Sequence, residues 1–132
     1  MKVLHILDHS LPLHSGYTFR SQSLFRAQRA MGFEPVVLTS PKHEQSWQGP
    51  APARETIGDF TYYRSGLVPR FPVPLLGEAR LMQVLERRIL EVAGAERPAV
   101  LHAHSPVLNA LPALRAGRKL GLPVVYEIRA FW

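Results

Sequence analysis

Residues 2–39 read KVLHILDHSLPLHSGYTFRSQSLFRAQRAMGFEPVVLT, and this stretch decides the fold. Lys2–Leu7 is a short apolar run, which predicts a buried strand. A loop with proline and glycine follows, and the pattern then predicts a helix from about Thr18 to Met31. Pro35–Thr39 is a second run of β-branched residues. A strand, a helix and a second strand form the unit from which parallel sheets are built.

The predicted helix has two chemically different sides. Leu24, Ala27 and Met31 share one side at helical spacing, and we expect this side to pack on the sheet. Gln22 and Arg26 lie on the opposite side, which we expect to face solvent.

The same alternation of short apolar runs and amphipathic segments continues to the end of the chain. The helix near residue 85 is the clearest, because Met82, Leu85, Ile89 and Val92 recur at helical spacing. Before the last helix, Ser105 fits an N-cap followed by proline at the first helical position. The expected elements after residue 39 are a long loop over 40–55, a strand over 56–64, a proline-punctuated loop over 65–76, the helix around 82–92, a strand over 99–103, a helix over 105–120 and a strand over 124–128.

This order predicts one α/β domain over residues 1–132. Short apolar strands that alternate with amphipathic helices favour a mainly parallel sheet with helices on both faces, which is a doubly wound, Rossmann-like arrangement.

Composition excludes several classes of protein. The 132 residues contain no cysteine, so disulfides, thiolate metal sites and a cysteine nucleophile are excluded. The net charge of +6 favours anionic partners, but the basic residues are scattered, which argues against a nucleic-acid interface. No apolar run approaches the roughly 20 residues that span a bilayer, so we expect a cytoplasmic protein.

The candidate site follows from the sheet topology. Ligands of doubly wound sheets bind at the carboxyl ends of the strands, which here selects three segments: 8–17, 104–105 and 127–132. Ser15 and Gly16 stand where the first helix begins, and backbone N–H groups there favour an anion such as a diphosphate. The sequence lacks both the GxGxxG fingerprint and the P-loop motif.

His104, Glu127 and Arg129 are the side chains expected to join this loop. His104 ends a strand and can hydrogen-bond a sugar hydroxyl or a phosphate. Glu127 and Arg129 alternate on one face, either as a mutual ion pair or as an arginine aimed at a phosphate and held by its neighbour. We expect no metal, because His102 and His104 share a face but no third ligand is evident, and His5 is expected to be structural.

Two segments carry a resemblance to a known family. Residues 1–41, MKVLHILDHSLPLHSGYTFRSQSLFRAQRAMGFEPVVLTSP, and residues 100–132, VLHAHSPVLNALPALRAGRKLGLPVVYEIRAFW, resemble the N-terminal lobe of family 4 glycosyltransferases. The closest similarity is to the exosortase-associated subset of the bacterial enzymes. The resemblance covers essentially the whole chain and rests on the order and spacing of motifs.

The resemblance implies a GT-B enzyme with two Rossmann-like lobes, of which this chain is an incomplete, acceptor-side N-terminal one. The nucleotide-sugar lobe is then absent, and the chain alone is expected to be inactive. The implied reaction transfers a sugar, with retention and without a metal or other cofactor, from a nucleotide-diphosphate sugar to an acceptor hydroxyl in cell-surface polysaccharide or glycolipid synthesis. The sequence departs from the family where Ser15 replaces a glycine and Arg129 replaces a histidine.

Three further expectations remain beside this one. The chain could instead be a non-catalytic acceptor-binding module, or a lobe of a GT-B sugar-nucleotide epimerase. The acceptor is expected to be a glycan or a lipid-linked molecule. Leu67, Val68, Phe71, Leu75 and Leu76, with arginines nearby, either cover the core or form a contact on the acceptor side or with the inner face of a membrane.

Overall fold

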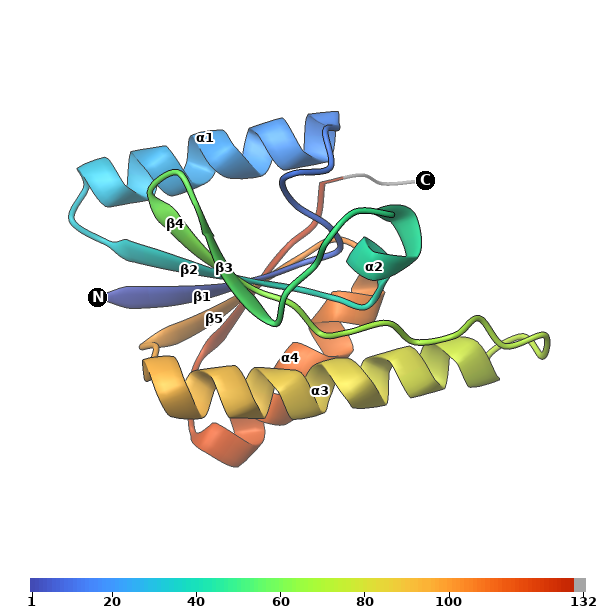
Figure 1. Ribbon diagram of the computed structural model, residues 1–132. Coiled ribbons are helices and arrows are strands. Elements are labelled where there is room, and N and C mark those ends of the chain that lie inside the picture. Colours follow the sequence, from blue (N-terminus) through green and yellow to red (C-terminus); the bar gives the residue numbers. More distant parts are fainter. Residues whose placement is uncertain (130–132) are drawn as a thin grey trace.

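The computed structural model describes residues 1–129, which form one six-stranded sheet in the order β3-β4-β2-β1-β5-β6 (Figure 1). Four pairings are parallel, and β3 alone runs antiparallel, against β4. The mainly parallel, Rossmann-like sheet is therefore confirmed. The strands are β1 (Lys2–Leu7), β2 (Glu34–Thr39), β3 (Arg54–Ile57), β4 (Phe60–Tyr63), β5 (Val100–His104) and β6 (Val124–Glu127).

Helices cover both faces of this sheet. Figure 1 shows α1 on one face and α3 with α4 on the other, whereas α2 lies at the edge where the parallel strands end. This is the doubly wound arrangement that the sequence predicts. The helices are α1 (Gly16–Ala30), α2 (Lys42–Ser46), α3 (Leu76–Glu96) and α4 (Val107–Leu120).

The face under α3 and α4 holds the larger apolar core. Leu4 and Ile6 of β1 point to this side, because alternate residues of a strand face opposite ways. They meet the apolar side of α3, where Leu85, Ile89 and Val92 are buried as predicted. Each such side chain contributes roughly 1.5–3 kcal/mol through burial.

The face under α1 is more polar than expected. The helix buries Thr18, Ser21, Gln22 and Phe25, whereas Met31 is 73% exposed, so the predicted orientation of this helix is wrong. The physical reason is that the strands below it carry polar groups that need partners.

Two contacts supply those partners. The amide of Gln22 donates to the hydroxyl of Tyr62 on β4, and the Gln28 side chain lies 2.7 Å from Nε2 of His5 on β1. Phe25 also packs here in a second apolar cluster with Leu7, Val37, Phe60 and Tyr62, so these hydrogen bonds and the burial of Phe25 together orient α1.

The segment expected as one strand over 56–64 is a hairpin. β3 and β4 are joined through Gly58 and Asp59, with Gly58 at a φ of 60°, a conformation that glycine adopts readily. The preceding long loop contains α2 and the start of β3. The single-strand prediction was wrong because a turn at glycine outweighs a continuous run of β-forming residues.

The start of α4 also differs from the prediction. Ser105 does not cap the helix; the residue before the first helical turn is Pro106, and the hydroxyl of Ser105 instead donates to the carbonyl of Glu127, 3.1 Å away. The helix continues through Pro112 to Leu120, and Gly121 ends it in the left-handed conformation.

Gly117 and Gly94 provide a matched test of the packing of α4. A Cβ at Gly117 would lie 2.5 Å from Cγ2 of Val124 and 3.0 Å from the carbonyl oxygen of Leu122, whereas a Cβ at Gly94 meets nothing within 4 Å. Gly117→Ala should destabilise the chain by about 1–3 kcal/mol through overpacking. Gly94→Ala should stabilise it by roughly 0.5–1 kcal/mol through helix propensity. Urea denaturation followed by circular dichroism measures both, and equal effects of the two changes would contradict this packing.

Candidate functional site

The loops after β1 and β5 meet at the side chain of Tyr17, on the first turn of α1. Its hydroxyl accepts a hydrogen bond from the backbone N–H of Asp8 at 3.0 Å and donates one to the carbonyl of Ser105 at 2.8 Å. Burial raises the pKa of Tyr17, so the phenol stays protonated and can donate. One hydroxyl therefore joins two segments that are far apart in the sequence.

Ser15 and Gly16 lie at the start of α1, as predicted. The Oγ of Ser15 caps the helix by accepting from the N–H of Thr18 at 3.1 Å, and Nε2 of His9 lies 2.8 Å from the same oxygen. The space beside Cα of Gly16 is open, since a Cβ there would meet no atom within 4 Å. The position can thus admit a ligand, although the diphosphate role of Ser15 and Gly16 remains a prediction.

Arg129, which follows β6, links the end of that strand to the first turns of α1 through hydrogen bonds. Its Nε donates to Oε2 of Glu127 at 3.0 Å, its Nη1 to the carbonyl of Tyr17 at 3.2 Å, and its Nη2 to Oγ of Ser21 at 3.2 Å. The guanidinium also stacks on the Tyr17 ring, 4.5 Å from its centroid. The predicted pair of Glu127 and Arg129 therefore exists, and the arginine is mostly engaged by protein groups.

His104 continues this network into the protein interior. Its Nδ1 lies 2.6 Å from Nη2 of Arg129 and 2.8 Å from Oε2 of Glu127, and its Nε2 lies 2.9 Å from Nδ1 of His5. Nε2 of His5 is in turn 2.7 Å from the side-chain oxygen of Gln28. Arg129, His104, His5 and Gln28 form one hydrogen-bonded chain with the two buried histidines at its centre, which we call the histidine chain.

Burial decides the protonation of the histidine chain. Loss of hydration lowers the pKa of His5 to about 3 and also lowers the pKa of His104, with Arg129 adding to both shifts. Both rings are therefore neutral at pH 7. Nδ1 of His104 faces both a donor, Nη2 of Arg129, and an acceptor, Oε2 of Glu127. Donation from Nε2 of both histidines satisfies the contacts with Arg129, His5 and Gln28. His104 is fully buried, so a sugar cannot contact its ring in this conformation.

The sheet register brings a third histidine to the two that the sequence placed on one face. His5 pairs with His102 across β1 and β5, and His5, His102 and His104 each offer a ring nitrogen within 4.8 Å of the others. Three neutral imidazoles at this separation are close enough to bind one metal ion. However, two of the rings already bond each other, and the Arg129 guanidinium beside them opposes a cation. The expectation of a metal-free site remains untested.

A fully buried arginine, Arg64, holds the loop that follows β1. It donates from Nη1 to Oγ of Ser10 at 2.7 Å and from Nη2 to the carbonyl of Leu11 at 2.5 Å, and its Nε lies 3.6 Å from Oε2 of Glu55. Nearby, burial raises the pKa of Glu44 to about 7. Arg64 is not among the predicted site residues, because the end of the strand expected over 56–64 was not assigned to this edge.

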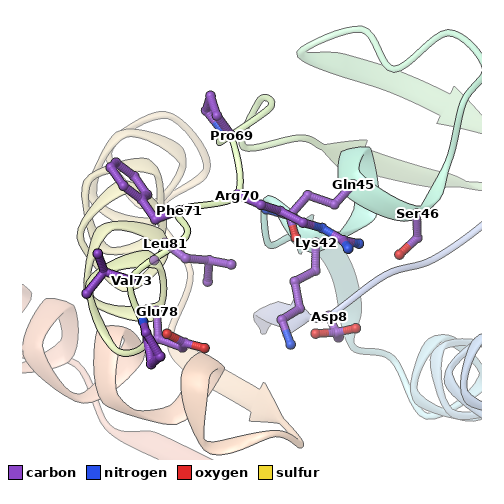
Figure 2. A pocket seen from close by; sticks show the side chains of 12 residues that line it. Asp8, Lys42, Gln45, Ser46, Pro69, Arg70, Phe71, Val73, Glu78 and Leu81 are labelled. Atoms are coloured by element: carbon purple, nitrogen blue, oxygen red, sulfur yellow. The ribbon is translucent and has the colours of Figure 1, made fainter.

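An open cavity of about 460 Å³ lies at the same edge, between α2, the segment 65–75 and the start of α3 (Figure 2). Asp8, at the end of β1, is common to this cavity and to the loop that Tyr17 holds. The other lining residues are Lys42, Gln45, Ser46, Pro69, Arg70, Phe71, Val73, Pro74, Gly77, Glu78 and Leu81. The sequence prediction included neither α2 nor segment 65–75 in the candidate site.

The structure thus brings all the predicted site residues to one end of the sheet. Glu127, Arg129 and His104 contact one another, and Arg129 reaches α1 next to Gly16. The prediction missed Tyr17 and Ser21, whose roles depend on how α1 is rotated. The catalytic or binding roles of the predicted site residues remain predictions.

None of the helices within residues 1–129 is long and apolar enough to cross a bilayer.

Comparisons with known proteins agree with this geometry. The Glycosyl transferase 4-like domain matches residues 15–132. The sulfoquinovosyl transferase SQD2 of Arabidopsis thaliana is 33% identical over 111 residues, which is 84% of this chain and 19% of that protein.

Solved structures share the fold at low identity. The UDP-GlcNAc 2-epimerase of Methanocaldococcus jannaschii gives a TM-score of 0.60 at 14% identity, over 96% of this chain and 31% of that one. MurG of Acinetobacter baumannii gives 0.59 at 13% identity, over 98% of this chain and 36% of that one. The chain therefore spans a minor part of each of these relatives.

The α/β lobe, the convergence of its loops at the carboxyl edge and the sequence match over most of its length lead to one conclusion: the chain belongs to the family of glycosyl transferase 4-like domains.

Proposed function

We propose that the chain is the acceptor-side lobe of a retaining glycosyltransferase. The observation that carries this proposal is the family match over residues 15–132, combined with an open cavity at the edge where the parallel strands end. The donor would be a nucleotide-diphosphate sugar, and the second, nucleotide-sugar lobe would lie outside these residues. We further propose that the enzyme acts in cell-surface polysaccharide or glycolipid synthesis and resembles the exosortase-associated subset.

In this proposal the lobe positions the substrates and stabilises charge. The bond between the sugar and the diphosphate breaks, the acceptor oxygen bonds to the sugar carbon, and the leaving diphosphate takes the acceptor proton. The backbone N–H groups at the start of α1, beside the open space at Gly16, and the positive charge of Arg129 would stabilise the negative charge that develops on the diphosphate. No metal or organic cofactor is assigned a role.

Arg129 would act mainly through the first turn of α1. Its contacts with Tyr17 and Ser21 fix the helix start where a phosphate would bind. The histidine chain would in turn fix Arg129, because neutral His104 accepts one of its N–H groups. Buried groups held in this way cost little reorganisation when the transition state forms.

The first prediction concerns the chain by itself. Residues 1–132, incubated with a panel of nucleotide sugars and with glycan and lipid-linked acceptors, should give no transfer product by mass spectrometry. One lobe cannot enclose a donor or exclude water from it. A product formed by the isolated chain would contradict the two-lobe proposal, and a released 2-epimer would favour the epimerase alternative.

The second prediction concerns Arg129 in the two-lobed enzyme. Arg129→Ala should lower kcat by about 100-fold, as expected for loss of a group that stabilises developing charge. Arg118→Ala, near the end of α4, is the control and should leave kcat unchanged. If both variants turn over at the parent rate, Arg129 is only a structural clamp.

We also propose that segment 65–76 contacts an anionic membrane surface. Its large apolar side chains are not core residues: Leu67, Phe71, Val73, Leu75 and Leu76 are 49–77% exposed, and only Val68 is buried. The prolines of this segment keep it out of the sheet, as Figure 1 illustrates with the long extended connection before α3. Exposed apolar groups beside cations are typical of peripheral membrane contacts.

The third prediction tests this contact with vesicles. The chain should sediment with vesicles rich in phosphatidylserine at low salt and should be released as salt rises. Phe71→Ser with Leu75→Ser should reduce the bound fraction several-fold by removing apolar insertion. Leu111→Ser with Leu114→Ser removes two leucines of α4 that are 39% and 43% exposed, and should have no effect. Equal loss in the two double variants would contradict a contact through segment 65–76.

A further inference from the structure

The cavity of Figure 2 contains two cations that the protein does not neutralise. Lys42 extends from α2 toward Asp8, and Arg70 extends from segment 65–75 toward α2. Within residues 1–129, neither side chain has an acidic group within 4.0 Å. Both line the cavity and remain available to a ligand.

The two acids of the cavity already have partners. Oδ2 of Asp8 lies 3.1 Å from Nδ1 of His9, and Oε2 of Glu78 accepts the backbone N–H of Leu75 at 2.9 Å. These contacts occupy one oxygen of each carboxylate, and Lys42 and Arg70 are the positive charges that line the cavity. An anionic ligand placed between Lys42 and Arg70 would gain two charge-assisted interactions.

One wall of the cavity is apolar and continues onto the outer surface. Phe71 and Val73 line the cavity and are 50% and 49% exposed, and Leu75 and Leu76 extend the same apolar strip outside it. Exposed apolar side chains directly beside a polar pocket suit a ligand with a polar end and a hydrocarbon end.

The walls are held in place by the protein itself. The side-chain amide of Gln45 on α2 donates to the carbonyl of Val68 at 2.8 Å, and Val68 is buried. This bond ties segment 65–75 to α2, so that Lys42 and Arg70 face the same space from two separate elements.

We propose that this cavity binds the phosphate-bearing head of an anionic amphiphile, with Lys42 and Arg70 on the phosphate and the hydrocarbon chain along Phe71, Val73 and Leu75. Two cations from different walls match the charge of a phosphate monoester. The free carboxylate oxygens of Asp8 and Glu78 would accept hydroxyl groups of the same head. The further step, that this amphiphile is the sugar acceptor, rests on the proposed function.

The experiment measures binding without any donor sugar. The 132-residue chain is titrated with dihexanoyl phosphatidic acid below its micelle concentration, with inorganic phosphate, and with dihexanoyl phosphatidylcholine, while amide and side-chain NMR shifts are followed. Phosphatidic acid should bind at least about tenfold more tightly than either of the others, because it alone combines a dianionic head with a hydrocarbon chain. The shifts should centre on Lys42, Arg70 and Phe71.

Matched variants separate a built site from diffuse attraction. Lys42→Ala with Arg70→Ala should weaken phosphatidic acid by about tenfold or more. Arg80→Ala with Arg87→Ala removes the same charge from the exposed side of α3 and should change the Kd less than twofold. Phe71→Ser should weaken phosphatidic acid but leave the binding of inorganic phosphate unchanged.

Each outcome decides the proposal. Equal losses in the two double variants, or phosphate binding as tight as phosphatidic acid, would overturn the amphiphile site. If the chain binds phosphatidic acid tightly and specifically but its two-lobed form transfers no sugar, the proposed function is wrong and the cavity assignment stands. Active transfer to a lipid acceptor with KM unchanged by Lys42→Ala and Arg70→Ala would show that the amphiphile is not the acceptor.

Discussion

The hydrogen-bond chain from Gln28 through His5 and His104 to Arg129 is the constraint on which the rest of this edge depends. Buried polar groups must find partners, since each unsatisfied one costs about 1–3 kcal/mol. The two strands supply imidazoles under α1, and the helix therefore turns its glutamine toward them. That rotation also puts Tyr17 and Ser21 within reach of the guanidinium.

The same chain separates two kinds of residue at the carboxyl edge. The histidines and Arg129 are buried and bonded to the protein, so they hold the loops in place. The open space lies instead at the cavity, where Lys42 and Arg70 have no acidic partner among residues 1–129 and one wall is apolar. Asp8 directly follows β1 and connects the two regions: its backbone N–H bonds the Tyr17 hydroxyl, and its side chain borders the cavity. The division suits a lobe that presents an acceptor to a donor held elsewhere.

Sequence similarity and fold similarity support different conclusions about this chain. Sequence similarity over most of the chain establishes the glycosyl transferase 4-like family. The shared fold of epimerases and transferases, at 13–14% identity, does not separate one chemistry from another. The features that could do so belong to individual residues: the guanidinium of Arg129 against α1, the open space at Gly16, and Lys42 and Arg70 in the cavity. These residues are accordingly the ones on which the proposals rest.

The sequence by itself determined the parallel strands, the alternation of strands with the three long helices, the helices on both faces and the edge at which His104, Glu127 and Arg129 meet. Those features follow from apolar periodicity and from crossover topology, which are local or nearly so. Only the tertiary structure decided the rotation of α1, the hairpin at Gly58, the third histidine and the cavity. Each of these depends on which groups become neighbours across strands: β1 pairs in register with β5, so His5 lies beside His102, a contact between residues 97 positions apart that no local pattern contains.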